Sequence, residues 1–105
     1  MLQFKKMSKE EYMNSDDTNG THAIGAVETT YDKLVKIFGK PTFGTKSVCG
    51  KVSKEWILKF EDGTIATIYD WKEKQTPKGV YEWHIGGFNE KAHDYVNEVV
   101  KNFIG

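Results

Sequence analysis

The chain has 105 residues, with 15 basic and 15 acidic side chains, a formal net charge of zero and a hydrophobic fraction of 38%. This size and composition fit one folded domain, residues 1–105, with a single core. A neutral domain lacks the positive field that long nucleic acid requires, so we expect no duplex binding. No apolar run approaches the length of a membrane span, and we expect a cytosolic protein without a signal peptide.

The first 20 residues form a less certain N-terminal segment with weak structural signals. Met1–Phe4 is compatible with a short strand, and Ser8–Met13 with a turn of helix. Asn14–Gly20 is polar and rich in turn-forming residues, which predicts a loop. His22–Glu28 carries apolar residues around Gly25 and predicts the first long strand.

A helix with clear start and stop signals follows this strand. Thr29 or Thr30 can cap its start, because a hydroxyl there accepts a free N–H of the first turn. Gly39 stands where a left-handed C-cap belongs, and Pro41 prevents continuation. Lys40–Gly50 then predicts a loop. One apolar stripe runs along the helix at helical spacing, and it consists of Tyr31, Leu34, Val35 and Phe38.

The strongest local signal is a β-hairpin from Trp56–Phe60 to Ile65–Tyr69. Asp62-Gly63 between these segments favours a two-residue type I′ turn, whose twist matches paired strands. That turn would place three cross-strand pairs on one face of the hairpin: Phe60 with Ile65, Leu58 with Thr67, and Trp56 with Tyr69.

The same register would leave Ile57 and Ile68 on the reverse face, at the open end of the hairpin. In a single-layer sheet, an apolar patch there would be exposed to solvent. We therefore expect either a terminal segment or another subunit to cover it.

The remainder predicts a loop over Lys72–Gly79, a third strand over Val80–Ile85 beside the hairpin, and a final helix capped by Asn89. Gly86-Gly87 is expected to end that strand. The helix has an apolar stripe of Ala92, Tyr95, Val96, Val99, Val100 and Phe103. The order β-α-β-β-β-α predicts an α+β fold, an antiparallel sheet of three to five strands with two helices on one face.

The sequence contains no recognisable catalytic or metal-binding set. Its histidines, His22, His84 and His93, accompany no nucleophile motif, and the single Cys49 allows no disulfide within the chain. Asp16-Asp17 lacks the further ligands of a calcium loop. We therefore expect no catalytic residues, no metal and no cofactor. Two interpretations of His84 remain open: a strand histidine that is hydrogen-bonded to backbone, or a residue that contacts a ligand.

The aromatic side chains of the central strands are the best functional signal. Flat rings stack nucleobases, each stack contributing about 1–3 kcal/mol. Nearby lysines and hydroxyls would suit a nucleotide or another flat anion. The alternative is that several of these rings are core residues, and for Trp56 the two interpretations weigh equally. The rings are Trp56, Tyr69, Trp71, Tyr81 and Trp83, and the polar residues are Lys51, Lys54, Lys72, Thr45, Ser47 and Ser53.

Four blocks of this sequence resemble a family of small bacteriophage proteins, the anti-CBASS sponges, which sequester cyclic dinucleotide signals of bacterial immunity. The resemblance covers roughly Gly25 to Val100 and leaves out the first 20 residues. The blocks are Thr30-Tyr31-Asp32-x-Leu34-Val35-x-x-Phe38-Gly39-x-Pro41, Lys51-Val52-Ser53-x-Glu55-Trp56, Phe60-x-Asp62-Gly63-Thr64-x-Ala66-Thr67-Ile68-Tyr69-Asp70-Trp71 and Trp83-His84-Ile85-Gly86-Gly87.

The resemblance implies a homotetramer that binds molecules such as 3′3′-cyclic GMP–AMP without cleaving them, in the cytoplasm of the infected bacterial host. The site residues are assigned from residue chemistry at the matching positions. Base stacking is assigned to aromatic side chains, phosphate contact to Lys51, Ser53 and Thr30, and a base edge or phosphate to His84. The stacking candidates are Trp71, Tyr69, Trp83 and Trp56.

Two other functions remain open at this point. A small phosphodiesterase could use His84 and Asp70 as acid and base, although no second histidine or metal cluster supports it. An interaction module could instead dock its aromatic face on a host protein.

Overall fold

The computed structural model describes residues 3–6, 22–42, 54–70 and 79–103. The expected Ser8–Met13 turn of helix and Asn14–Gly20 loop lie outside these residues. The elements, in chain order, are β1 (Phe4–Lys6), β2 (His22–Thr29), α2 (Tyr31–Phe38), β3 (Glu55–Phe60), β4 (Ile65–Tyr69), β5 (Tyr81–Gly87) and α3 (Glu90–Asn102).

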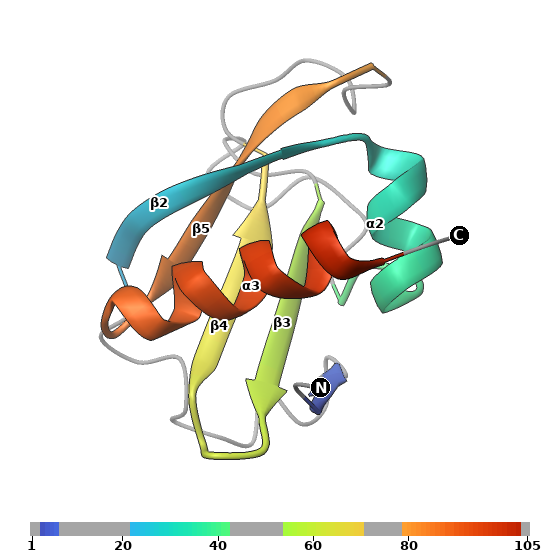
Figure 1. The fold of residues 1–105 in the computed structure, drawn as a ribbon. Helices are drawn as coiled ribbons and strands as arrows, with labels where there is room; N and C mark the ends of the chain where they lie inside the picture. The colour runs from blue at the N-terminus through green and yellow to red at the C-terminus, as the bar shows by residue number, and fades with distance from the viewer. Residues whose placement is uncertain (1–2, 7–21, 43–53, 71–78, 104–105) are drawn as a thin grey trace.

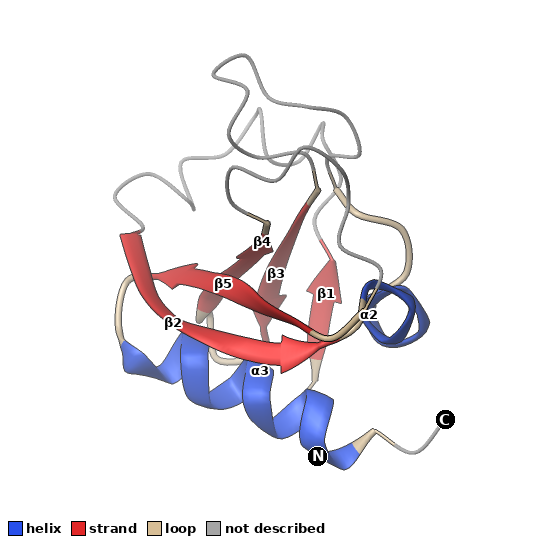
Figure 2. Ribbon diagram, turned by 90° about the horizontal axis from the view of Figure 1, so that it is seen from above, coloured by secondary structure: helices blue, strands red, loops and turns tan. Residues whose placement is uncertain are grey.

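The strands form one five-stranded antiparallel sheet in the order β1-β3-β4-β5-β2. Figure 1 shows α3 lying across β5, β4 and β3, and Figure 2 shows that it covers one face of the sheet, with α2 at the side. The predicted α+β class is confirmed, and the predicted order of elements is matched apart from the short strand β1 that precedes them. No helix of the described residues is long and apolar enough to cross a membrane.

Helix α2 begins and ends where the sequence predicted. The Thr30 hydroxyl accepts the N–H of Lys33 at 3.2 Å, which satisfies one free donor of the first turn. At the other end Gly39 takes a positive φ of 82° and donates its N–H to the carbonyl of Val35. The helix buries Leu34 and Phe38 in the common core.

The hairpin turn differs from the prediction. Gly63 donates to the Phe60 carbonyl at 2.9 Å and Phe60 donates to the Thr64 carbonyl at 2.8 Å, so residues 61–63 close the loop. Gly63 has a φ of 90°, as in a three-residue loop whose glycine adopts the left-handed conformation. Asp62 supports this loop, because one carboxylate oxygen accepts the N–H of Thr64 at 3.0 Å.

The longer loop moves the register by one residue, so the predicted pairs of the hairpin are wrong. Trp56 faces Ile68 and not Tyr69, and Glu55 takes the position opposite Tyr69. Because side chains alternate along a strand, a shift of one residue turns β4 over relative to β3. Ile68 therefore enters the core beneath the helices, while Tyr69 points to the reverse face.

The core fills the face of the sheet that the helices cover. Trp56 packs edge to face on Trp83, with ring centroids 5.6 Å apart, and its indole N–H donates to the Gly39 carbonyl at 2.9 Å. This bond connects the hairpin to the end of α2. Tyr31 and Tyr81 pack around the two indoles, so most of these aromatic side chains serve as core residues.

The reverse face is not the exposed apolar patch that was expected. Ile57 does point away from the helices, but it is completely buried within the chain. Ile65 and Thr67 on the same face are also buried. Of the two predicted covers, a terminal segment or another subunit, the second is not needed, because Ile57 and Ile68 are both buried within one chain.

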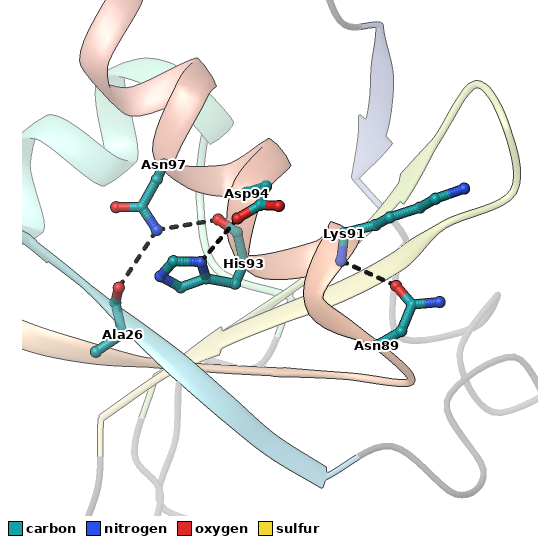
Figure 3. Close-up of polar contacts among 6 residues, drawn as sticks. All are labelled: Ala26, Asn89, Lys91, His93, Asp94 and Asn97. Carbon is teal, nitrogen blue, oxygen red and sulfur yellow. Dashed lines mark hydrogen bonds and ion pairs between the residues drawn. The ribbon is translucent and has the colours of Figure 1, made fainter.

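Helix α3 begins at its predicted cap and packs closely on β2 and β5. The Asn89 side chain accepts the N–H of Lys91 at 2.9 Å. Further along, the Asn97 amide donates to the Ala26 carbonyl of β2 at 3.3 Å and to the His93 carbonyl of its own helix at 3.0 Å (Figure 3). The bond to Ala26 holds α3 against the outer strand.

Gly86 and Gly87 lie inside β5 and do not end it, contrary to the prediction. A Cβ on Gly87 would lie 2.6 Å from the Cβ of Ala92 in α3. Glycine at this position therefore sets how closely the helix approaches the sheet. The pair is explained by packing, without an anion-binding turn.

Replacing Gly87 with alanine should destabilise the fold by about 1–3 kcal/mol, because the new methyl group overpacks the contact with Ala92. Urea denaturation would measure the change. Gly79→Ala is the matched control, since no atom lies within 4 Å of the Cβ it would add. Equal stability of the two variants would contradict the proposed role of Gly87.

Candidate functional site

A row of paired residues crosses the reverse face of the sheet. The register places Glu55 of β3 opposite Tyr69, Tyr69 opposite His84 of β5, and His84 opposite Ala26 of β2. Their side chains share a face, because the neighbouring pair Val27 and Trp83 points into the core. The row lies at the open end of the hairpin and brings a carboxyl, a phenol and an imidazole together.

Two rings of this row are stacked. The centroids of Tyr69 and His84 are 5.5 Å apart and their planes are 18° from parallel. Both residues are half-buried, so neither is enclosed in the core. Both are predicted ligand-binding residues, and the structure brings them together on the reverse face.

The other predicted site residues divide into two groups. Trp56 and Trp83 have no exposed surface; they offer no ring face to a ligand, and we assign both to the core. The Thr30 hydroxyl caps α2, and Thr30 follows the end of β2, whereas the residue of β2 that pairs with His84 is Ala26. Trp71, Lys51 and Ser53 lie outside the described residues.

Glu55 is a member of the row that sequence reasoning did not select. Burial, and then the nearby Asp70 carboxylate, raise its pKa from 4.5 to about 7. Burial also raises the pKa of the Tyr69 phenol, with a smaller contribution from Glu55. Sequence reasoning could have selected Glu55 only from the correct hairpin register, because that register sets Glu55 opposite Tyr69.

Asp70 has a structural role at the open end of the hairpin. It is fully buried, and one of its carboxylate oxygens accepts the N–H of Lys54 at 3.0 Å. Its own N–H donates to the Lys54 carbonyl at 3.4 Å. The pairing of Asp70 with His84 as an acid and a base therefore gains no support from these contacts.

Gly86 gives the stacked pair its space. A Cβ on Gly86 would lie 2.5 Å from the Thr67 hydroxyl oxygen and 3.5 Å from Cε1 of Tyr69. The absence of a side chain on β5 thus lets Tyr69 and Thr67 pack next to the strand. The two neighbouring glycines therefore make space on opposite faces of the sheet. Gly86 makes space for the candidate site, and Gly87 makes space for helix α3.

A separate hollow of about 310 Å³ lies between the hairpin tip and the start of α3, where Phe88 and Lys91 are among its lining residues. Asp62 borders it and accepts a hydrogen bond of 2.6 Å from the Tyr95 hydroxyl. This bond is the main cause that lowers the Asp62 pKa to about 2. Within the described part of the chain, no group of three or more potential metal ligands occurs.

Comparisons with models of protein families, with curated proteins and with solved structures find no match to this chain.

The raised pKa of Glu55 predicts a pH-dependent stability. Between pH 4.5 and about 7 the folded chain holds a proton that the unfolded chain has released, so this contribution to stability falls as pH rises through that range. Glu55→Gln, which stays neutral, should therefore gain stability relative to wild type between pH 4 and pH 8. One pKa unit corresponds to about 1.4 kcal/mol, so the gain should be on the order of 1–3 kcal/mol.

Urea denaturation at the two pH values would measure this gain, with the exposed Glu61→Gln as the control. A Glu55→Gln variant whose advantage over wild type is the same at both pH values would show that Glu55 titrates normally.

Proposed function

We propose that the protein binds and sequesters a cyclic dinucleotide, such as 3′3′-cyclic GMP–AMP, without cleaving it, and so blocks CBASS activation in the cytoplasm of an infected bacterial host. The observation that carries the proposal is the half-buried Tyr69–His84 stack on the face of the sheet that the helices leave uncovered. Aromatic rings of this kind provide stacking surface for nucleobases.

Sequence neighbours of the row supply the rest of the proposed site. Trp71 follows Asp70 directly, and Lys51 and Ser53 precede Lys54, the residue that Asp70 holds. Stacking would come from Tyr69, His84 and Trp71, and phosphate contact from Lys51 and Ser53. The identity of the ligand is proposed on the resemblance to anti-CBASS sponges.

Titration with 3′3′-cyclic GMP–AMP should show saturable binding by calorimetry. Tyr69→Ala and His84→Ala should each weaken it by about tenfold to hundredfold, since one stack contributes about 1–3 kcal/mol. Phe88→Ala is the matched control, because Phe88 is an exposed aromatic residue next to α3, outside the row.

The ligand recovered after denaturation should be intact by chromatography. Cleaved ligand would favour a phosphodiesterase, and an absence of binding to every cyclic oligonucleotide would rule the proposal out. A stoichiometric host protein captured without nucleotide would favour the interaction module.

We also propose a homotetramer, on the resemblance alone. Native mass spectrometry of the protein should show a tetramer of the 12.0 kDa chain, with bound nucleotide when the producing cells make the signal. A monomer that persists across micromolar concentrations would contradict this assembly.

A further inference from the structure

The stacked pair has two ends, and they differ in chemistry. Along the row, Tyr69 lies between Glu55 and His84, and His84 lies between Tyr69 and Ala26. Strands are about 4.8 Å apart, which is close to the spacing of stacked rings. A third flat ring would therefore fit the row in the place above the next strand.

Of the two ends, the one at Ala26 carries the smaller side chain. At the other end the Glu55 side chain is half-buried beside Tyr69 and lies close enough to raise the pKa of the phenol. Ala26 carries only a methyl group, and its strand β2 is the outer strand of the sheet. The side of His84 that faces β2 therefore has no large side chain of β2 in the row.

Next to this place two carboxylates oppose each other. Glu28 of β2 pairs with Glu82 of β5, and both residues are exposed. They share the face of Ala26 and His84, because the pair Val27 and Trp83 between them points into the core. Like charges directly opposite each other destabilise a sheet, so the fold gains nothing from this pair.

We infer that a nucleobase stacks on His84 above the Ala26 methyl group, and that Glu28 and Glu82 make guanine the preferred base. This inference rests on the proposed function and assigns one base of the ligand to a place. Ionised carboxylates only accept hydrogen bonds. The Watson–Crick edge of guanine offers two neighbouring N–H donors, whereas that of adenine offers one donor beside an acceptor, and such edges are how proteins read an exposed base.

The stacking place is tested by filling it. Ala26→Leu should weaken binding of 3′3′-cyclic di-GMP by at least about tenfold, because the larger side chain takes the place assigned to the base beside His84. Ala23→Leu is the control, since Ala23 is an exposed residue of the same strand beyond its bulge. An Ala26→Leu variant that is folded and binds as tightly as wild type would overturn the assignment.

The base preference is tested by comparing two symmetric ligands at pH 7.5. Wild type should bind 3′3′-cyclic di-GMP about tenfold or more tightly than 3′3′-cyclic di-AMP, and the double variant Glu28→Gln, Glu82→Gln should bring this ratio close to one. Glu98→Gln, an exposed position of α3, controls for a change of charge.

The outcomes of this comparison are distinct. Equal binding of both ligands by wild type, or an unchanged ratio in the double variant, would overturn the role of the carboxylates. Wild type that binds neither ligand nor 3′3′-cyclic GMP–AMP would overturn the proposed function itself.

Discussion

The positive φ of Gly63 fixes the hairpin, and most of the molecule follows from it. With three residues in the loop, β4 presents Ala66 and Ile68 to the helices and Tyr69 to the reverse face. A two-residue loop would have put Tyr69 in the core and left Ile68 outside. The carboxylate of Asp62 favours the longer loop, because it binds the N–H of Thr64 within the turn and the hydroxyl of Tyr95 on α3.

This register also divides the aromatic residues into a core group and a group on the reverse face. Trp56 and Trp83 meet edge to face inside the core, and the indole N–H of Trp56 holds the end of α2. His84, the residue that follows Trp83 on β5, stacks with Tyr69 of β4 on the other face. A sheet of paired strands thus carries a packed aromatic layer on one side and a polar, titratable row on the other.

The sequence predicted the helices and the order of elements along the chain well, because their signals are local. Thr30, Gly39 and Asn89 are capping residues whose preferences do not depend on distant contacts. The hairpin register was not predictable in the same way, because Asp-Gly suits both a two-residue and a three-residue loop. The choice between them involves Tyr95, which is 33 residues further along the chain.

The candidate site was predicted in part for the same reason. Tyr69 and His84 were selected for their chemistry, and strand pairing brings them together. Trp83 has the same chemistry as a free stacking ring, and only its burial against Tyr81 and Trp56 distinguishes it. Glu55 was not predicted, because a single carboxylate forms no sequence motif. Its raised pKa arises from burial and from Asp70, which only the folded structure brings about.

The contact between Asn97 and Ala26 has a consequence for the solubility of the protein. An outer strand exposes unpaired backbone groups, which invite a strand of another chain and lead to aggregation. The Asn97 amide occupies the Ala26 carbonyl near the middle of β2, and the bulge between Ala23 and Gly25 interrupts the regular ladder at its start. Helix α3 therefore occupies one backbone acceptor of the longest outer strand of the described sheet, which removes it from edge-to-edge pairing, as well as completing the core.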